Sequence, residues 1–203
     1  MSVRTLDYYD QHAAAFFADT IDVDMSPLQE HFLRLLPDRA RILDAGCGSG
    51  RDAKCFADRG YRVTAFDASP KLVALAASHL GQPVHCLRFQ DLSWEHEFDG
   101  IWASASLLHV PIAELPDVLR RLTRALKRPG VLYASFKYGQ GEREHRGRRF
   151  TDLDEPGLAA LLRHVPDLEP VRIWSSTDRR PGREAERWLN TILRTTGSTW
   201  VNS

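Results

Sequence analysis

The sequence predicts an α/β protein with a doubly wound, mostly parallel sheet of seven strands and helices on both of its faces. Short apolar stretches alternate with helical stretches from residue 41 onward, which is typical of parallel strands joined by helical crossovers. Glycines and prolines mark the boundaries between these stretches. Near the end of the chain, two strand-like stretches follow one another through a polar connection, so we expect the last strand to run antiparallel.

The size and composition favour a single domain over residues 1–203. The chain carries 27 basic and 27 acidic residues, so its overall charge favours neither a nucleic acid nor a membrane as partner. No apolar run is long enough to span a membrane, and the first residues lack the apolar core of a secretory signal. The three cysteines have no metal-ligand or paired spacing. We therefore expect a cytoplasmic monomer or homodimer without a metal.

The first part of the chain, residues 1–38, is predicted to be helical. Aromatic residues recur at roughly helical spacing between residues 8 and 17, and the stretch 22–26 interrupts the pattern. Ser26 followed by Pro27 is a typical beginning for the next helix. This segment is expected to form a lid over the rest of the domain.

The middle of the chain, residues 39–138, is the predicted core. Runs rich in apolar, β-branched and aromatic residues indicate strands, while helical periodicity between capping residues indicates helices, as where Ser69 begins a helix and Gly81 ends it. We expect strands at 41–45, 61–67, 83–89, 98–106 and 131–139, and helices at 51–60, 69–81 and 113–130. The remaining residues, 139–203, are expected to form an exposed loop at 139–149, a helix at 154–165, and strands at 170–177 and 187–196.

The stretch RILDAGCGSGRDA, residues 41–53, runs from an apolar strand into Asp44 and then three alternating glycines. Ligands of open parallel sheets bind at the carboxyl ends of the strands, where glycines let the backbone approach them. The spacing is G-x-G-x-G rather than the dinucleotide pattern G-x-G-x-x-G, and a carboxylate here would repel a pyrophosphate. The loop therefore favours a ligand with a cationic group over the nicotinamide cofactor of a dehydrogenase. Cys47 is interpreted as a small turn residue rather than a nucleophile, because no base is visible near it.

Two more acids follow the next two strands. Asp67 ends the stretch RVTAFD, 23 positions after Asp44, where an acid is able to bind the hydroxyls of a ribose. Asp91 comes just after the third strand and is able to accept a hydrogen bond from the exocyclic amine of an adenine, with Leu92 and Trp94 as apolar neighbours. Together these positions predict a nucleoside-bearing cofactor.

These motifs resemble the class I S-adenosylmethionine-dependent methyltransferases, through ILDAGCGSGRDA, VTAFDAS, RFQDLSW, FDGIWASASLLHV and LKRPGVLYASF in that order. The continuation Gly50–Arg51 is most similar to the small bacterial methyltransferases of the tellurite-resistance type. The resemblance covers residues 40–137 well and implies a Rossmann-like methyltransferase fold with S-adenosyl-L-methionine as cofactor. It implies contacts to the methionine part from Ala45, Gly46 and Gly48, to the ribose from Asp67 with Ala68 and Ser69, to the adenine from Asp91 and Leu92, and beneath the sulfonium from Ala103 and Ser104. Asp44 would act through water or by orienting the loop.

Methyl transfer from a sulfonium is an in-line displacement of an already activated group, so the protein mainly aligns the reactants. A base helps only where the acceptor must lose a proton. His109, after the fourth strand, is the candidate catalytic residue, with a packing role as the alternative. Tyr9 of the lid is the candidate cofactor contact, with core packing as the alternative.

Basic residues near the fifth strand predict an acidic acceptor. Lys137 ends that strand, and Arg149 follows in a polar loop with three more arginines, whose planar guanidinium groups suit carboxylate or phosphate. Acids interleaved in the loop leave open that it is simply solvated.

The leading hypothesis is methyl transfer to a small molecule. Its alternatives are a regulatory or partner subunit that binds S-adenosylmethionine without transferring the methyl, and RNA or protein as acceptor. An acceptor pocket blocked by bulky side chains would favour the regulatory subunit.

Overall fold

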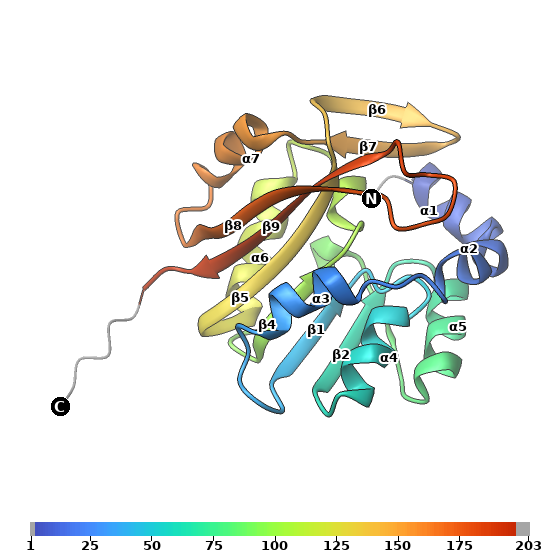
Figure 1. The fold of residues 1–203 in the computed structure, drawn as a ribbon, viewed down its shortest axis with the longest axis horizontal. Helices are drawn as coiled ribbons and strands as arrows, with labels where there is room; N and C mark the ends of the chain where they lie inside the picture. The colour runs from blue at the N-terminus through green and yellow to red at the C-terminus, as the bar shows by residue number, and fades with distance from the viewer. Residues whose placement is uncertain (1–2, 198–203) are drawn as a thin grey trace.

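The computed structural model describes residues 3–197, which form a mixed sheet of seven strands in the order β3-β2-β1-β4-β5-β9-β8 (Figure 1). The strands are β1 (Arg41–Ala45), β2 (Arg62–Asp67), β3 (His85–Cys86), β4 (Phe98–Ala103), β5 (Leu126–Lys137), β8 (Leu168–Thr177) and β9 (Arg187–Thr195). Strands β1 to β5 are parallel, and β9 runs antiparallel between β5 and β8. The predicted fold class, including the antiparallel last strand, is confirmed.

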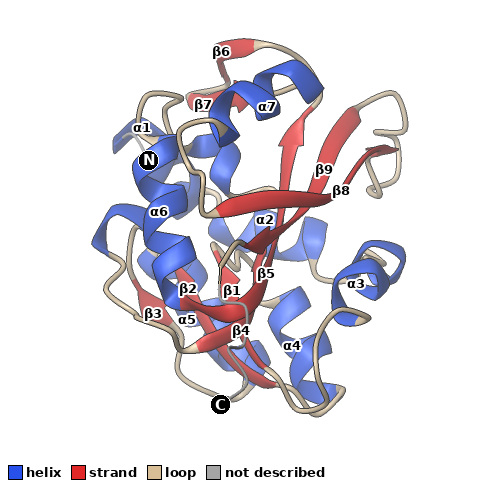
Figure 2. Ribbon diagram, turned by 90° about the vertical axis from the view of Figure 1, so that its left-hand side faces the viewer, coloured by secondary structure: helices blue, strands red, loops and turns tan. Residues whose placement is uncertain are grey.

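Helices cover both faces of this sheet (Figure 2). One face carries α3 (Ser26–Leu33), α4 (Arg51–Asp58) and α5 (Pro70–Leu80), and the other carries α6 (Leu115–Ala125) and α7 (Glu155–Leu162). On the α3–α4 side, the buried rings of Trp102 and Tyr133 stack with their centroids 3.8 Å apart and pack against Phe32 of α3. The strand side chains that point the other way pack against α6 and α7, so β1, β4, β5 and β9 each contribute to two cores.

The chain order crosses from β1 to β4 at the centre of the sheet, where Asp44 lies between Ala65 of β2 and Trp102 of β4. Helices α4 and α5 follow β1 and β2 and begin at the carboxyl ends of those strands. The Ser69 hydroxyl caps α5 by accepting from the Leu72 N–H, and Gly81 ends this helix in the left-handed conformation, as its position in the sequence predicts. This switch point is where open α/β sheets place their ligands.

The segment predicted as a loop at 139–149 is instead largely a hairpin, formed by β6 (Gly141–His145) and β7 (Arg148–Asp152). Its turn consists of Arg146 and Gly147, both with positive φ, which suits a two-residue hairpin connection. Strand β6 is exposed along its whole length, so its polar side chains conceal the strand in the sequence. Only the partner strand shows a buried apolar residue, Phe150.

Several element boundaries also differ from the prediction; for example, β4 ends at Ala103 rather than at residue 106. Helix α6 ends at Ala125 rather than near residue 130, because β5 already begins at Leu126, which lies opposite Phe98 of β4. Strand β3 spans only two residues, because the chain turns into a short 3-10 helix, η1 (Phe89–Asp91), before the predicted strand ends. The early end of β3 changes which side chains of this segment line the cavity described below.

Two short helices, α1 (Val3–Gln11) and α2 (Ala13–Thr20), lie near the carboxyl ends of the parallel strands, beside α5 and the hairpin (Figure 1). The N–H of Arg149 in β7 donates to the Thr5 hydroxyl of α1. On the other side, Asp10 accepts from the Ser69 hydroxyl and the Lys71 N–H at the start of α5. Helix α1 is therefore held at both sides of the site. Across residues 3–197, the structure contains no helix with the length and apolarity that crossing a membrane requires.

Candidate active site

The loop after β1 is built from glycines that no other residue replaces without strain. Gly46 has φ +77°, and a Cβ there would lie 2.6 Å from the Cβ of Ser106. The N–H groups of Gly46 and Cys47 both donate to the Phe66 carbonyl at 2.9 Å, which binds the loop to the end of β2. At Gly48, a Cβ would lie 3.0 Å from the ring of Phe16 in α2. The loop thus passes closely between the sheet and α2.

Asp67, at the end of β2, is held by the same loop. One carboxylate oxygen accepts the Gly48 N–H at 3.0 Å and the other accepts the Ser69 N–H at 2.9 Å. Burial raises the pKa of Asp67, and these backbone donors oppose that rise. Each oxygen keeps a further lone pair, and the residue borders the cavity described below. The carboxylate is therefore able to accept hydrogen bonds from two hydroxyl groups of a ligand.

Asp44 is buried and has a structural contact of its own. Its carboxylate accepts the Ala53 N–H of α4 at 3.0 Å, which connects the end of β1 to the first turn of that helix. Burial, together with the nearby charge of Asp52, raises its pKa well above the ordinary value. Burial alone would raise the pKa of Asp52 too, but Arg51 beside it and the indole N–H of Trp102 lower it. Asp44 thus fixes the end of β1 to α4, and Asp52 fixes α4 to Trp102 of β4.

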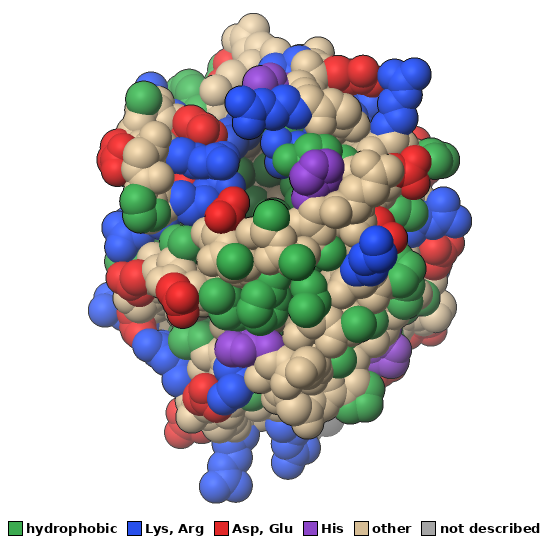
Figure 3. Space-filling model, turned by 90° about the vertical axis from the view of Figure 1, so that its right-hand side faces the viewer, with side chains coloured by type: hydrophobic (Ala, Val, Ile, Leu, Met, Phe, Trp, Pro, Cys, Tyr) green, Lys and Arg blue, Asp and Glu red, His purple; other side chains and the backbone are tan. Residues whose placement is uncertain are grey.

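A cavity of about 800 Å³ opens between the glycine loop, helices α1 and α2, the hairpin and the β8–β9 connection. Sites for small molecules commonly measure about 300–1,000 Å³, so this volume lies in the upper part of the range. The space-filling view shows the hollow, with basic and histidine side chains gathered near it (Figure 3).

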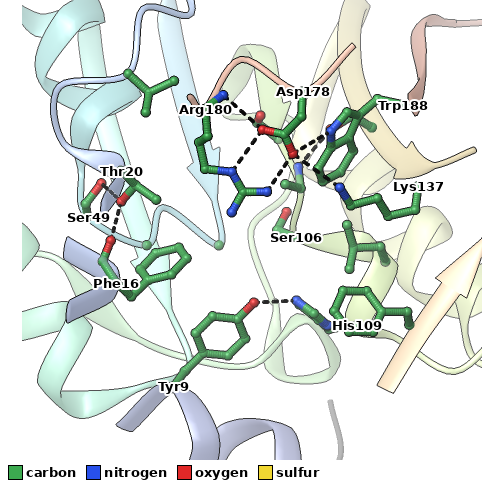
Figure 4. Close-up of a pocket in the computed structure, with 18 of the residues that line it drawn as sticks. Tyr9, Phe16, Thr20, Ser49, Ser106, His109, Lys137, Asp178, Arg180 and Trp188 are labelled. Carbon is green, nitrogen blue, oxygen red and sulfur yellow. Dashed lines mark hydrogen bonds and ion pairs between the residues drawn. The ribbon is translucent and has the colours of Figure 1, made fainter. Parts of the chain in front are cut away.

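One wall of the cavity carries a chain of hydrogen bonds through His109 (Figure 4). His109 Nδ1 lies 2.7 Å from the Arg149 carbonyl, which only accepts, so Nδ1 carries the proton. Its Nε2 therefore accepts from the Tyr9 hydroxyl, also at 2.7 Å. Burial lowers the pKa of His109 to about 4, and Arg148 adds to that effect. The imidazole is neutral at pH 7, and both of its nitrogens are engaged.

The opposite wall holds a compact charge cluster around Asp178, on the connection between β8 and β9 (Figure 4). Its carboxylate accepts from Arg180 at 2.6 Å, from Lys137 at 3.2 Å and from the indole N–H of Trp188 at 3.0 Å. Burial would raise the pKa of Asp178, but these donors hold it well below the ordinary value. Glu186 also pairs with Lys137. Sequence reasoning missed Asp178 and Arg180, because no motif marks them.

The cavity brings together eight of the residues predicted for the site: Tyr9, Gly46, Gly48, Asp67, Ala68, Ser104, His109 and Lys137. Cys47 also borders it, and burial raises the pKa of its thiol well above the ordinary value, so the thiol stays protonated.

Six other predicted residues are not part of the cavity lining: Ala45, Ser69, Asp91, Leu92, Ala103 and Arg149. Asp91 is exposed and pairs with Arg88 at 3.3 Å, while Leu92 is buried in the core. The 3-10 turn places Leu87, Arg88 and Phe89 at the cavity instead. Ser69 caps α5, and Ala45 and Ala103 are buried strand ends. The Arg149 side chain pairs with Glu142 of β6 rather than facing the cavity.

Comparison with known proteins agrees with this geometry. Residues 43–134 match the model of the methyltransferase domain family. The ubiquinone biosynthesis O-methyltransferase of Xanthomonas axonopodis pv. citri is 35% identical over 109 residues, which cover 50% of this chain and 45% of that protein. This chain therefore spans about half the length of the curated relatives that it matches.

Among solved structures, the 1,6-didemethyltoxoflavin-N1-methyltransferase of Burkholderia thailandensis, with 1,6-didemethyltoxoflavin and S-adenosylhomocysteine bound, superposes with a TM-score of 0.77 at 26% identity, over 96% of this chain and 88% of that one. A TehB-like S-adenosylmethionine-dependent methyltransferase of Corynebacterium glutamicum shares the fold, with a TM-score of 0.68 at 20% identity over 94% of this chain and 98% of that one. The predicted resemblance to the class I S-adenosylmethionine-dependent methyltransferases is confirmed by the family match over residues 43–134 and by the fold shared with these structures.

Proposed function

We propose that this protein transfers a methyl group from S-adenosylmethionine to a small-molecule acceptor by in-line displacement. The observation that carries the proposal is one continuous cavity. It joins the glycine loop and Asp67 at one end to Tyr9, His109 and Lys137 at the other.

The residues at the first end fit the cofactor of the family. Gly46 and Gly48 line the cavity with backbone alone, and Asp67 presents two oxygens with free lone pairs for the ribose hydroxyls. When bound, S-adenosylmethionine supplies a methyl group already activated on a sulfonium. The protein's part is then to align the acceptor and to exclude water, which needs no covalent step on the chain.

A small acceptor fits the second end better than a macromolecule does. The lid helix α1 is bound to α5 through Asp10 and to the hairpin through Thr5, so the cavity is partly covered. The toxoflavin enzyme and the ubiquinone biosynthesis enzyme named above both carry small molecules in their names. A regulatory subunit would be favoured by a blocked acceptor pocket, and the volume of about 800 Å³ argues against that alternative.

We assign His109 a positioning role in place of the predicted base. Its pKa of about 4 makes it a weak proton acceptor near pH 7, and its Nε2 already accepts from the Tyr9 hydroxyl. Its neutral ring instead connects Tyr9 to the backbone of β7 through the Arg149 carbonyl. Tyr9 is therefore held at the cavity wall in one orientation.

The first test is isothermal titration of the protein with S-adenosylhomocysteine, with NAD in a parallel titration. We expect micromolar binding of the former and none of NAD. A methyl-transfer assay with labelled S-adenosylmethionine then follows, over a panel of small aromatic acceptors that includes 1,6-didemethyltoxoflavin. Tight binding of S-adenosylhomocysteine without turnover on any acceptor would support the regulatory subunit, and absence of binding would refute the cofactor assignment.

A further inference from the structure

The second end of the cavity carries an excess of positive charge. From residue 133 onward, the lining contains eight Lys and Arg residues and three Asp and Glu residues. The protein as a whole has equal numbers of both kinds, so this excess is local. A concave surface with one sign of charge concentrates ligands of the opposite sign.

The three acids of this surface already have basic partners. Asp178 pairs with Arg180 and Lys137, Glu186 also pairs with Lys137, and Asp152 pairs with Arg143. Glu186 also pairs with Arg183, and among the described residues none of the three acids pairs with Arg148.

Among these arginines, Arg148 differs in its surroundings, because its guanidinium lies among aromatic rings. Its guanidinium lies 4.4 Å from the ring centre of Tyr8, 5.2 Å from that of Phe150 and 5.8 Å from that of Tyr9. These cation–π contacts hold the group beside the Tyr9–His109 wall. Within residues 3–197 no carboxylate forms an ion pair with Arg148, and its buried Nε has no hydrogen-bond partner. A cation placed in this way has donors left for an anion.

We propose that the methyl acceptor is a planar organic anion, such as an aromatic carboxylate or a deprotonated heterocycle, and that the guanidinium of Arg148 binds its charge. The inference rests on the proposed function and names the substrate class of the same site. We take the anion to be planar because the cavity beside Arg148 is lined by the rings of Tyr9, His109 and Phe150, and a planar ring packs against aromatic rings in stacked or edge-to-face arrangements.

The strand geometry distinguishes Arg148 from its neighbour. Successive side chains of a strand point to opposite sides, so Arg148 lines the cavity while Arg149 pairs with Glu142 outside it. Sequence reasoning placed acceptor recognition on Lys137 and Arg149. In the structure Lys137 forms ion pairs with Asp178 and Glu186, whereas Arg148 has no carboxylate partner among the described residues.

The test compares an acid with its uncharged amide in the protein saturated with S-adenosylhomocysteine. Three pairs serve as probes: benzoate and benzamide, 4-hydroxybenzoate and 4-hydroxybenzamide, and 2-naphthoate and 2-naphthamide. We expect at least one acid to bind about tenfold more tightly than its amide, which is the scale of one charge-assisted hydrogen bond.

Variants of the two neighbouring arginines complete the experiment. Arg148→Gln should abolish the preference for the acid, Arg148→Lys should keep part of it, and the matched control Arg149→Gln should keep all of it. Equal binding of acid and amide, binding of none of the acids, or a preference that survives in Arg148→Gln would overturn the inference. Circular dichroism and the affinity for S-adenosylhomocysteine verify that each variant is folded. Failure of the unmodified protein to bind S-adenosylhomocysteine would count against the proposed function instead.

Discussion

The two ends of the cavity are constructed in different ways. At the end assigned to the cofactor, the key groups come from one short stretch, residues 44–67, and many of them are backbone N–H groups or the absence of a side chain. At the acceptor end, the key groups are side chains from distant parts of the chain, namely Tyr9, His109, Arg148 and Asp178. The first kind of site is a local property of a strand and its loop. The second exists only after the whole domain has folded.

The largest effect is expected at the centre of the cofactor end. Asp67→Ala removes both hydroxyl acceptors and leaves the Gly48 and Ser69 N–H groups without their partner. Hydrogen bonds to a charged group contribute about 1.5–3 kcal/mol each, so we expect the affinity for S-adenosylhomocysteine to fall a few hundred-fold or more in a calorimetric titration.

The control for this variant is Asp91→Ala, at the other acid that the motif reasoning selected. Asp91 is exposed and pairs with Arg88, so the affinity should stay within about twofold of the unmodified protein. A large loss in Asp91→Ala would show that the third acid reaches the cofactor after all.

A pair of glycines tests whether the loop itself is as constrained as the geometry indicates. Gly46→Ala combines a left-handed backbone with a Cβ 2.6 Å from that of Ser106, so we expect it to lower the free energy of unfolding by roughly 3–4 kcal/mol. Gly60→Ala has a similar φ, +86°, but among the described residues no atom beyond its chain neighbours lies within 4 Å of the added Cβ, so this variant should cost about 1 kcal/mol. Urea denaturation measures both, and equal losses would contradict the close approach at Gly46.

At the acceptor end, His109 makes stability depend on pH. Its folded-state pKa of about 4 lies below the ordinary value of 6.5, so the unfolded chain binds the proton more strongly. The stabilisation is present above pH 6.5 and is lost as the pH falls toward 4. When the pH falls from 7.5 to 5, protonation of His109 in the unfolded chain should lower the free energy of unfolding by about 2 kcal/mol. The variant His109→Gln should lack this part of the pH dependence. An unchanged pH profile in the variant would show that other groups cause it.

The smallest effect is expected where α1 meets the acceptor end, at Tyr9. Tyr9→Phe removes the hydroxyl that donates to His109 and should lower the free energy of unfolding by about 1 kcal/mol. The affinity for S-adenosylhomocysteine should stay within about twofold. Tyr8→Phe is the matched control. Tyr8 contacts Arg148 and His12 with its ring, and phenylalanine keeps that ring. A marked loss of cofactor affinity in Tyr9→Phe would instead indicate that Tyr9 contacts the cofactor, as the sequence predicts.

The same contrast explains what could be predicted from the sequence. Asp67 ends a strand that is recognisable by itself, and its place beside the glycine loop follows from the pairing of β1 with β2. Asp91 follows a strand that is only two residues long, and the 3-10 turn after it gives Arg88 and Phe89 the place at the cavity.

At the acceptor end the sequence was less informative for physical reasons. Whether Arg148 or Arg149 faces the cavity depends on the phase of a hairpin whose outer strand is polar throughout, so hydrophobic alternation gives no signal there. Asp178 and Arg180 belong to the connection between β8 and β9, and only the pairing of β9 with β5 brings them to Lys137. Long-range contacts of this kind leave no local pattern.

The imidazole between Tyr9 and the Arg149 carbonyl has a consequence for spectroscopy. A ring N–H that is buried and donates to a backbone carbonyl exchanges with water only when the surrounding structure opens. The Nδ1 proton of His109 should therefore give an isolated, downfield resonance in a proton NMR spectrum recorded in water. Because the partner groups of this ring come from α1 and β7, the exchange rate of that single proton would report how often the first helix separates from the hairpin, and how a bound ligand changes that rate.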